Sequence, residues 1–509
     1  MNKPDSTRLF LLLATLVAVA VVTATALYNY RANRWGIYAE DYQTFHGLIR
    51  PNRHWMKTDF FIREDHGYDC VLFGSSRVAA IDTRKLEGNC YNFTHSGGLP
   101  VNHLSALKLF LESEIPLRRV YLGLDDISYQ WDPGDSSDQY MRRGYPRDLV
   151  EWLNAQVFYL LTPMDLRDLG LVTGEAALYP MPWHVRDPIR DWQRIHSESL
   201  EFYDDPIGQD ARFRHLRGTM EAGAFHGAEA AESVREFIAL AEAHGIEVIM
   251  FFNPMHYKTY LTRDYELYSQ FKRLVAEVAG FYDFTGFNRF SVDNRYWKET
   301  SHYTTIVGDH IVAVIQGASD AEPGFGRFTT AKNFDALEAA QLKTDIEYLP
   351  EIVRKEGLIG IPPRFSQLWA ERGYLKPAGM RQPSGEANRA LLDGGHIKLK
   401  RGDSQTEFRP GIWTDLPIDT LFLLNFSAQV HSRPSFTFSV RQSREKDGED
   451  WRYFRYVGRR GENSGHIAGY VTYDKPPIRL QLGPGLVDQT WKPVELFEVH
   501  PGLTEPPRS

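Results

Sequence analysis

Residues 69–77 read Asp-Cys-Val-Leu-Phe-Gly-Ser-Ser-Arg, an apolar run followed at once by small and polar residues. A run of this length that stops at a glycine is typical of a buried strand at the point where it leaves a sheet. Comparable runs return at residues 119–124, 246–252 and 281–284. Patterns typical of helices separate them, at residues 104–112 and 227–244. This alternation predicts an α/β domain with a parallel sheet and helices on both of its faces.

Polar or glycine-containing segments follow each predicted strand. In open parallel sheets the ligand site lies beyond the carboxyl ends of the strands. The segments expected at that edge are Gly74-Ser75-Ser76, His95-Ser96-Gly97-Gly98, Asp125-Asp126, Asn253-Pro254 and the loop Glu299 to His302. Residues 131–203, rich in Pro, Trp and Asp, interrupt the alternation and are expected to form an insertion.

Ser76 and His302 have the residue types of a nucleophile and its base. A serine hydroxyl is a poor nucleophile near neutral pH and needs a base within hydrogen-bond reach. His302 fits that role, and Glu299 would hold its tautomer and stabilise the imidazolium. Taken singly, Gly-Ser-Ser is more often an ordinary loop and Glu-x-x-His a solvated surface pair. Their shared position after strands favours the catalytic interpretation.

Gly74-Ser75-Ser76-Arg77 and the later Glu299-x-x-His302 resemble motifs of the SGNH (GDSL-like) hydrolase superfamily. The resemblance covers roughly Tyr68 to Ile315. It is similar in particular to the membrane-anchored periplasmic branch that includes alginate O-acetylation proteins and the teichoic-acid D-alanylation protein. The resemblance implies a flavodoxin-like three-layer fold with Ser76 as the nucleophile. Ser75 and Glu299 stand where the family usually has aspartate.

An oxyanion needs hydrogen-bond donors, and backbone N–H groups at glycine-rich strand exits are the usual source. The resemblance implies that these donors are the N–H groups of Ser76 and Gly97, with Gly98 as the alternative to Gly97. The family's third-block asparagine has no clean counterpart, because Asp125 stands at about that position. A carboxylate there disfavours an oxyanion unless it is protonated or turned away. Arg77 is a candidate contact to the substrate or oxyanion, with an ordinary surface arginine as the alternative.

Other polar residues near strand ends are candidates for lining a substrate pocket. Besides Arg77 and Asp125, they are Asn253, His256 and Asp283. A metal site would have to combine Asp125 with His95, His256 and His302, and no metal-ligand spacing supports such a site. We therefore expect neither a metal nor another cofactor.

The segment from Leu9 to Leu27 carries no charge, and about 20 apolar residues is the length that crosses a bilayer. Two interpretations are open. Ala24-Thr25-Ala26 offers the small residues of a signal-peptidase site, whereas the aromatic residues Tyr28, Tyr30 and Trp35 are typical of the interface beside an uncleaved anchor. We favour the anchor. The prediction is a single-pass protein of the cytoplasmic membrane, with most of the chain in the periplasm.

The chain has two cysteines, Cys70 and Cys90, each a few residues before a predicted strand exit. An exported compartment permits a disulfide between them. Two reduced cysteines that act as small buried hydrophobic residues are an equal alternative.

The length of 509 residues predicts more than one globular part. The expected divisions are a cytoplasmic tail at 1–8, a transmembrane segment at 9–28, a linker at 29–64, the SGNH-like domain at 65–320, a helical linker at 321–385 and an antiparallel, jelly-roll-like β-sandwich at 386–509. Aromatic residues of this last part form either a sugar platform or its core: Trp413, Trp451, Tyr453, Tyr456 and Trp491.

The net charge is −8 and the basic residues are dispersed, which argues against a nucleic-acid partner. Together these features predict a membrane-anchored serine acyltransferase or esterase that acts on O-acetyl groups of an exopolysaccharide or cell-envelope glycan. The resemblance favours the transferase, which would work with a membrane-bound protein that delivers acyl groups. The alternative is a non-catalytic glycan-binding or assembly scaffold of a polysaccharide export system.

Overall fold

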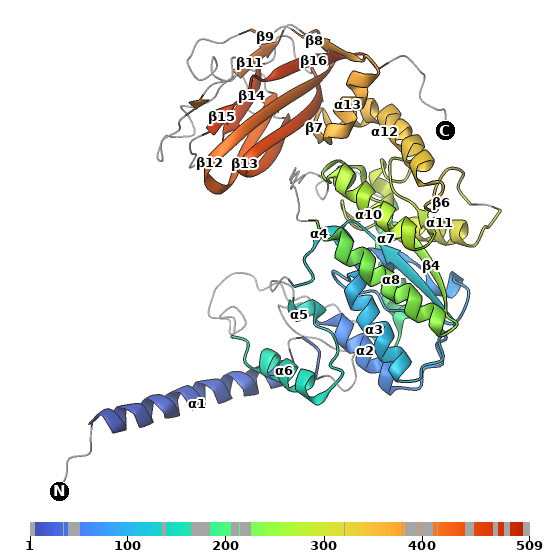
Figure 1. Ribbon diagram of the computed structural model, residues 1–509, viewed down its shortest axis with the longest axis vertical. Coiled ribbons are helices and arrows are strands. Elements are labelled where there is room, and N and C mark those ends of the chain that lie inside the picture. The colour runs from blue at the N-terminus through green and yellow to red at the C-terminus, as the bar shows by residue number, and fades with distance from the viewer. Residues whose placement is uncertain are drawn as a thin grey trace. The chain divides into compact units, whose positions relative to one another are not determined.

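The computed structural model describes most of the chain (Figure 1). The described residues are 6–33, 35–38, 51–134, 139–163, 184–204, 213, 225–319, 321–378, 380–381, 396–397, 411–414, 416–442, 452–471, 477–482 and 489–501.

The chain forms two compact units. Unit 1 comprises residues 1–198, 226–253 and 308–321, and unit 2 comprises residues 199–225, 254–307 and 322–509. The contacts thus divide the region 65–320 between two units. The linear domain boundaries expected from the sequence stay a prediction.

Unit 1 is built on four parallel strands, in agreement with the apolar runs. They are β1 (Cys70–Phe73), β2 (Cys90–Asn92), β3 (Arg119–Leu124) and β4 (Glu247–Phe252). β1 pairs with β2 on one side and with β3 on the other, and β3 pairs with β4. Every residue of β1 and β2 is buried, as expected of strands in a covered parallel sheet. Helices α3 (Pro100–Glu112) and α8 (Gly227–Ala243) pack against each other beside these strands (Figure 1).

The whole sheet has six strands in the order β2-β1-β3-β4-β5-β6. β5 (Phe281–Asp283) and β6 (Arg327–Thr329) are antiparallel, with Phe281 opposite Thr329. The sheet is therefore mostly parallel, and its one described antiparallel edge strand, β6, lies beyond the strands that the sequence predicted. A three-residue Arg-Phe-Thr strand carries no apolar run, and antiparallel edge strands are common on parallel sheets.

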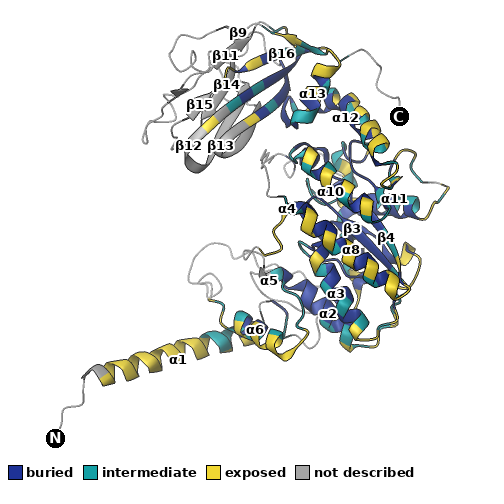
Figure 2. Ribbon diagram, viewed as in Figure 1, coloured by how far each residue is buried: buried dark blue, intermediate teal, exposed yellow. Residues whose placement is uncertain are grey.

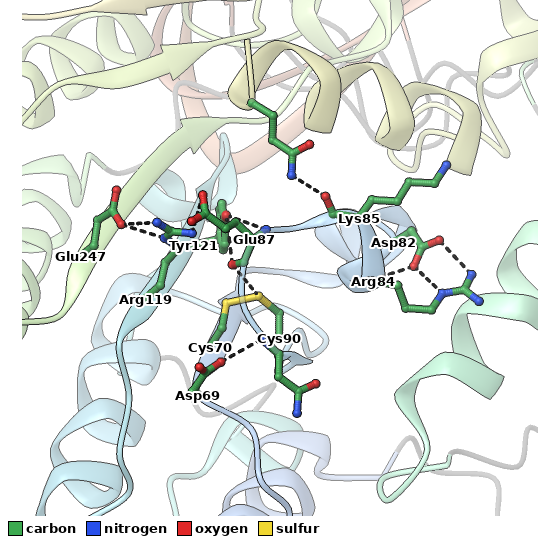
Figure 3. The surroundings of a disulfide bond; sticks show 12 residues. Asp69, Cys70, Asp82, Arg84, Lys85, Glu87, Cys90, Arg119, Tyr121 and Glu247 are labelled. Atoms are coloured by element: carbon green, nitrogen blue, oxygen red, sulfur yellow. Dashed lines mark hydrogen bonds and ion pairs between the residues drawn. A yellow bond between two sulfur atoms is a disulfide. The ribbon is translucent and has the colours of Figure 1, made fainter. Parts of the chain in front are cut away.

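Cys70 and Cys90 form a disulfide (Figure 3). The two residues are register partners on the neighbouring parallel strands β1 and β2, with their Cα atoms 4.2 Å apart. Of the two alternatives that the sequence left open, the structure shows the crosslinked one.

The N-terminal helix α1 (Ser6–Ala32) contains the span Arg8–Arg31, which is long and apolar enough to cross a membrane. Among the described residues no other helix passes this test of length and composition. Helix α4 (Ile127–Gln130) directly precedes the predicted insertion, and α5 (Gln139–Arg142), α6 (Leu149–Leu160) and nearly all of α7 (Pro188–Asp204) lie within it. The expected linker at 29–64 contains a mostly buried helix, α2 (Arg53–Arg63). Three further helices lie between β4 and β6 in the chain: α9 (Tyr257–Leu261), α10 (Tyr265–Val278) and α11 (Thr305–Ile315).

A separate antiparallel sheet follows, as predicted. Its strands are β7 (Leu358–Ile361), β8 (Leu375–Pro377), β9 (Met380–Arg381), β10 (His396–Ile397), β11 (Gly411–Thr414), β12 (Leu421–Gln442), β13 (Arg452–Tyr470), β14 (Pro477–Leu482), β15 (Gln489–Trp491) and β16 (Glu495–Val499). The expected helical linker supplies α12 (Phe334–Glu356) and α13 (Pro363–Glu371), but also β7 and β8, which pair with β13 and β16. The aromatic side chains of the predicted sugar platform lie outside the described part of the chain. They are Trp451, which is not described, and the side chains of Trp413, Tyr453, Tyr456 and Trp491.

Candidate functional site

The carboxyl ends of β1 and β3 carry a buried hydrogen bond between Ser75 and Asp125. The Ser75 hydroxyl donates to Asp125 Oδ2 over 2.5 Å, and the two residues are 2% and 1% exposed. Because β2 and β3 lie on opposite sides of β1, the order of the chain reverses here, and doubly wound sheets bind ligands at such a point. This hydrogen bond therefore lies at the carboxyl edge of the sheet, where the sequence predicts a ligand-binding site.

Ser75 and Ser76 have different environments. The Ser75 hydroxyl also accepts from the Arg77 N–H over 3.3 Å, which caps the 3-10 helix η1 (Ser76–Ala80). Ser76 is partly exposed, whereas Ser75 and Arg77 are buried. Gly74 makes this tight exit possible, since a Cβ atom there would lie 2.4 Å from Val78 Cγ2. Of the two serines, Ser76 is the one that solvent reaches.

Arg77 is an internal residue of this site. It is 6% exposed, forms an ion pair with Asp126, and places Nη1 3.5 Å from Asp125 Oδ2. The surface-arginine alternative is therefore wrong. Burial raises the pKa of Asp125, the charge of Arg77 opposes that rise, and neighbouring Asp126 adds to it, so that the net direction is upward. The predicted contact of Arg77 or Asp125 with substrate stays a prediction, and these internal partners weigh against it.

The loop after β2 contains the predicted oxyanion glycines. Gly97 has a left-handed backbone, with φ of +62°, and its missing Cβ would lie 2.7 Å from the Trp131 ring. The N–H of Gly98 donates to the His95 carbonyl oxygen over 3.3 Å, closing a turn. A glycine is thus needed at position 97, while the Gly98 donor is already used.

Two basic residues of α2 hold this loop, and sequence reasoning missed both. Arg53 Nη2 donates to Ser96 Oγ over 2.5 Å, and Lys57 Nζ donates to the carbonyl oxygens of Asn92 and Thr94 over 2.6 and 2.8 Å. Burial, together with the charge of Arg53, lowers the pKa of Lys57 to about 7. One signal was present in the sequence, since Asn52 is a favoured N-cap residue; its side chain accepts from the N–H of residue 55 over 2.9 Å.

Three buried histidines pack behind the loop. The rings of His54 and His95 have centroids 4.8 Å apart, and those of His95 and His103 are 5.3 Å apart. All three are at most 1% exposed. Burial lowers the pKa of each, to about 4 for His54 and about 3 for His103, so the cluster is neutral near pH 7. Within the described part of the chain, no group of three or more His, Cys, Asp and Glu side chains is arranged to hold a metal ion.

In unit 2, Glu299 and His302 form a hydrogen-bonded pair. His302 Nδ1 donates to Glu299 Oε1, and the second carboxylate oxygen of Glu299 accepts from the Ser301 N–H over 2.9 Å. A short hairpin fixes the pair, because the N–H of Lys298 donates to the His302 carbonyl over 2.9 Å. Because Nδ1 carries a proton and donates it in this hydrogen bond, Nε2 is the basic nitrogen of the neutral ring. Both side chains are 38% exposed, so the pair is accessible to solvent.

His256 is enclosed by its neighbours. Its Nε2 donates to Asn294 Oδ1 over 3.0 Å, and its Nδ1 accepts from the Lys258 N–H over 3.2 Å. Burial lowers the pKa of His256 to about 3. In unit 1, Asn253 is also fully buried, and its side chain donates to the Leu124 carbonyl over 3.2 Å. Their predicted substrate contacts stay predictions, and these closed environments weigh against them.

Asp283 belongs to a buried ion-pair cluster. Lys272 Nζ lies 3.1 Å from Asp283 Oδ2 and 2.9 Å from Glu338 Oε2. Burial alone would raise the pKa of Asp283, but the charges of Lys272 and Arg327 outweigh it and hold that pKa at about 2. This arrangement supports the fold of unit 2.

Neither the protein-family models nor the curated proteins compared with this chain match it significantly.

The structure thus brings some of the predicted residues together. Ser75, Arg77 and Asp125 meet in unit 1, where Ser76 and Gly97 also lie. Glu299 and His302 meet in unit 2. The described geometry supplies a partly exposed serine at a strand exit and, in unit 2, an oriented, solvent-accessible histidine.

Proposed function

We propose that this protein is a membrane-anchored, SGNH-type serine acyltransferase or esterase that acts on O-acetyl groups of an exopolysaccharide or cell-envelope glycan. The observation that carries the proposal is the hydrogen bond from His302 Nδ1 to Glu299. A carboxylate on Nδ1 holds a histidine in the tautomer that can take a proton from a serine. The proposed roles are Ser76 as nucleophile, His302 as base and Glu299 as the group that orients it.

The chemistry requires Ser76 Oγ to come within hydrogen-bond reach of His302 Nε2. The Ser76 oxygen then bonds to the acetyl carbon while Nε2 takes the hydroxyl proton. The ester C–O bond breaks, the leaving oxygen takes that proton, and acetyl-Ser76 remains. In the second half, a sugar hydroxyl or a water attacks the acetyl carbon, His302 takes its proton, and the proton returns to the departing Ser76 oxygen. A sugar acceptor makes the protein a transferase, and water makes it an esterase.

The oxyanion formed in each half needs donors. The proposal assigns the N–H groups of Ser76 and Gly97. The assignment of Gly97 rather than Gly98 is supported by the Gly98 N–H, which already donates to His95. The burial of Ser75 against Asp125 supports the choice of Ser76 as nucleophile.

The SGNH-type fold is part of the proposal. Strands β2-β1-β3-β4-β5 follow the order 2-1-3-4-5, which is the flavodoxin-like order. We further propose that residues 386–509 form a jelly-roll-like sandwich that binds glycan. The antiparallel pairing of β12 with β13 along one edge and with β14, β15 and β16 along the other supports the antiparallel β-sheet part of this proposal.

The proposed location is the cytoplasmic membrane, crossed once by α1, with most of the chain in the periplasm. The length and composition of α1 support the anchor. The Cys70–Cys90 disulfide supports an oxidising compartment, since disulfides rarely persist in the cytosol. The proposed partner is a membrane-bound protein that delivers acyl groups.

The test uses the full chain in detergent with a fluorophosphonate probe, which labels activated serines covalently. Labelling should occur in the wild type, persist in Ser75→Ala and disappear in Ser76→Ala and His302→Ala. Transfer of acetyl from a chromogenic ester to an oligosaccharide would identify a transferase, and release into water an esterase. Equal labelling of wild type and Ser76→Ala would refute the serine mechanism.

A second candidate function is a glycan-binding or assembly scaffold without catalysis. It is favoured by Asp125, a buried acidic side chain at about the position where the family has an oxyanion-donating asparagine. This candidate predicts glycan binding that is equal in the wild type and Ser76→Ala, together with no probe labelling in either.

A further inference from the structure

Helix α6 has its apolar side facing outward. A helix on the surface of a soluble domain normally exposes polar side chains and buries apolar ones. Five large apolar residues on one side of α6 are each between 43% and 70% exposed: Leu149, Val150, Leu153, Val157 and, directly after the helix, Leu161. We call these five residues the α6 apolar face. Figure 2 shows α6 largely in the colours of exposed and half-buried residues.

The opposite side of α6 is fixed to the body of unit 1. Tyr159 is fully buried, and its ring packs against Trp35 and Trp55 with centroids 5.3 and 5.9 Å apart. Its hydroxyl accepts from Asn52 Nδ2 over 2.8 Å. The helix cannot turn its apolar face inward without breaking this cluster.

The last turn of α6 is also fastened to the end of α1. Asn29, fully buried near the C-terminus of α1, donates through Nδ2 to the carbonyl oxygens of Leu160 and Thr162 over 2.9 and 2.8 Å. These carbonyls end the helix and would otherwise lack a helical partner. The direct hydrogen bonds place the α6 C-terminus beside the end of the apolar span Arg8–Arg31.

The length of α6 limits what the apolar face can do in a membrane. Twelve residues of helix extend about 18 Å, well short of the roughly 30 Å hydrocarbon core. A short helix of this kind can lie along a bilayer surface with its apolar side in the lipid. The one charged residue of α6, Glu151, lies in its first turn and pairs with Arg147, which precedes the helix, so the rest of α6 carries no charge.

We propose that α6 is an interfacial helix whose apolar face lies in the lipid of the bilayer that α1 crosses. This inference rests on the proposed membrane anchor. Lipid is favoured over a protein partner or a second copy because the face adjoins α1, whose exposed apolar side chains, such as Leu16 at 57% and Val17 at 62%, already require lipid.

The test places one spin label at a time on the full chain in nanodiscs of phosphatidylethanolamine and phosphatidylglycerol. The two native cysteines are joined in a disulfide, so an introduced cysteine is the site of labelling. The test positions are Leu153→Cys and Val157→Cys. The matched control is Glu232→Cys on α8, an exposed helical residue in a surface ion pair, and Leu16→Cys reports on α1.

Collision with oxygen, which concentrates in lipid, is compared with collision with a water-soluble nickel complex. The oxygen-to-nickel ratio should be several-fold higher at residues 153 and 157 than at residue 232. A ratio at 153 and 157 equal to that at 232, with a high ratio at Leu16→Cys, would overturn the interfacial helix and leave the anchor intact. A low ratio at Leu16→Cys would overturn the anchor itself. Spin–spin broadening between copies at 153 or 157 would assign the face to a second copy and also overturn the proposal.

Discussion

The hydroxyl of Ser75 lies 2.5 Å from Asp125 Oδ2, although 50 residues separate the two in the chain. The hydroxyl of Ser75 is therefore part of the buried structure, whereas the neighbouring Ser76 is partly exposed. It also supplies a hydrogen bond to an acidic group that is buried beside the ion-paired Arg77.

Ser75→Ala should therefore affect stability more than chemistry. Removing the hydroxyl takes a hydrogen bond from buried Asp125, which costs about 1–3 kcal/mol of unfolding free energy. Thermal unfolding in detergent should show the loss, while fluorophosphonate labelling per folded molecule remains. Loss of labelling in a Ser75→Ala protein that unfolds like the wild type would instead make Ser75 part of the chemistry.

Glu299→Gln should separate orientation from charge at the proposed base. The amide can still accept or donate a hydrogen bond but permits the wrong tautomer of His302, so kcat for acetyl transfer should fall by up to about 10⁴-fold. Glu299→Asp keeps the carboxylate and should lose less. Asp293→Asn, which removes a nearby ion pair with Arg295, is the control. Unchanged kcat in Glu299→Gln would remove Glu299 from the mechanism.

The buried histidines should make the protein sensitive to acid. His103 has a pKa of about 3 when folded and near 6.5 when unfolded, so the unfolded chain binds more protons between these values. Stability should then be complete above pH 6.5 and fall as the pH drops below it. His103→Leu should reduce the slope of unfolding free energy against pH by up to about 1.4 kcal/mol per pH unit. Urea unfolding across this range measures the slope, exposed His244→Leu is the control, and an unaltered slope in His103→Leu would contradict the prediction.

The disulfide should contribute measurably to the stability of unit 1. The crosslinked residues are 20 apart in sequence, for which the chain-entropy model gives about 3 kcal/mol. Cys70→Ala/Cys90→Ala should unfold at a lower temperature than the wild type, and a reductant should lower the wild-type Tm towards that of the variant. A reductant that lowers the Tm of the variant equally would show that the effect has another source.

Neighbouring residues 272 and 273 offer a matched comparison in unit 2. Lys272 is buried between Asp283 and Glu338, and Lys272→Met should cost about 3–5 kcal/mol because it removes the closer of the two cations that pair with buried Asp283. Arg273 pairs with Asp335 at the surface, and Arg273→Met should cost less than about 1 kcal/mol. Denaturant unfolding measures both, and equal losses would contradict the assignment of Lys272 as the buried support.

Elements with a strong local signal were predictable from the sequence. β1, β3 and β4 are apolar runs that end in glycine, aspartate or asparagine, and α8 has both helical composition and period. Glu299 and His302 were predicted as a pair because they lie three positions apart in the chain, and a local hairpin is enough to join them.

Contacts that depend on the fold were not predictable in this way. Ser75 and Asp125 meet only because β1 and β3 are neighbours. Arg53 and Lys57 look like solvated charges in the sequence, yet both are buried, where Arg53 donates a hydrogen bond to Ser96 and Lys57 donates to carbonyl oxygens at the end of β2 and in the loop after it. The pattern of α6 is apolar nearly all round, and only its packing shows which side is buried.

The asparagine at position 52 links parts of the molecule that face very different surroundings. Its N–H donates to the Trp35 carbonyl just beyond α1, and it begins the helix whose next residue, Arg53, holds Ser96 in the loop of the candidate site. A chain of direct hydrogen bonds thus joins the exit of α1 to that loop. For a protein anchored through α1, the fold rather than a flexible stalk would set the distance from the bilayer to Gly97. Under the proposed function, only those O-acetyl groups of a glycan that come to this fixed height above the lipid would reach the loop.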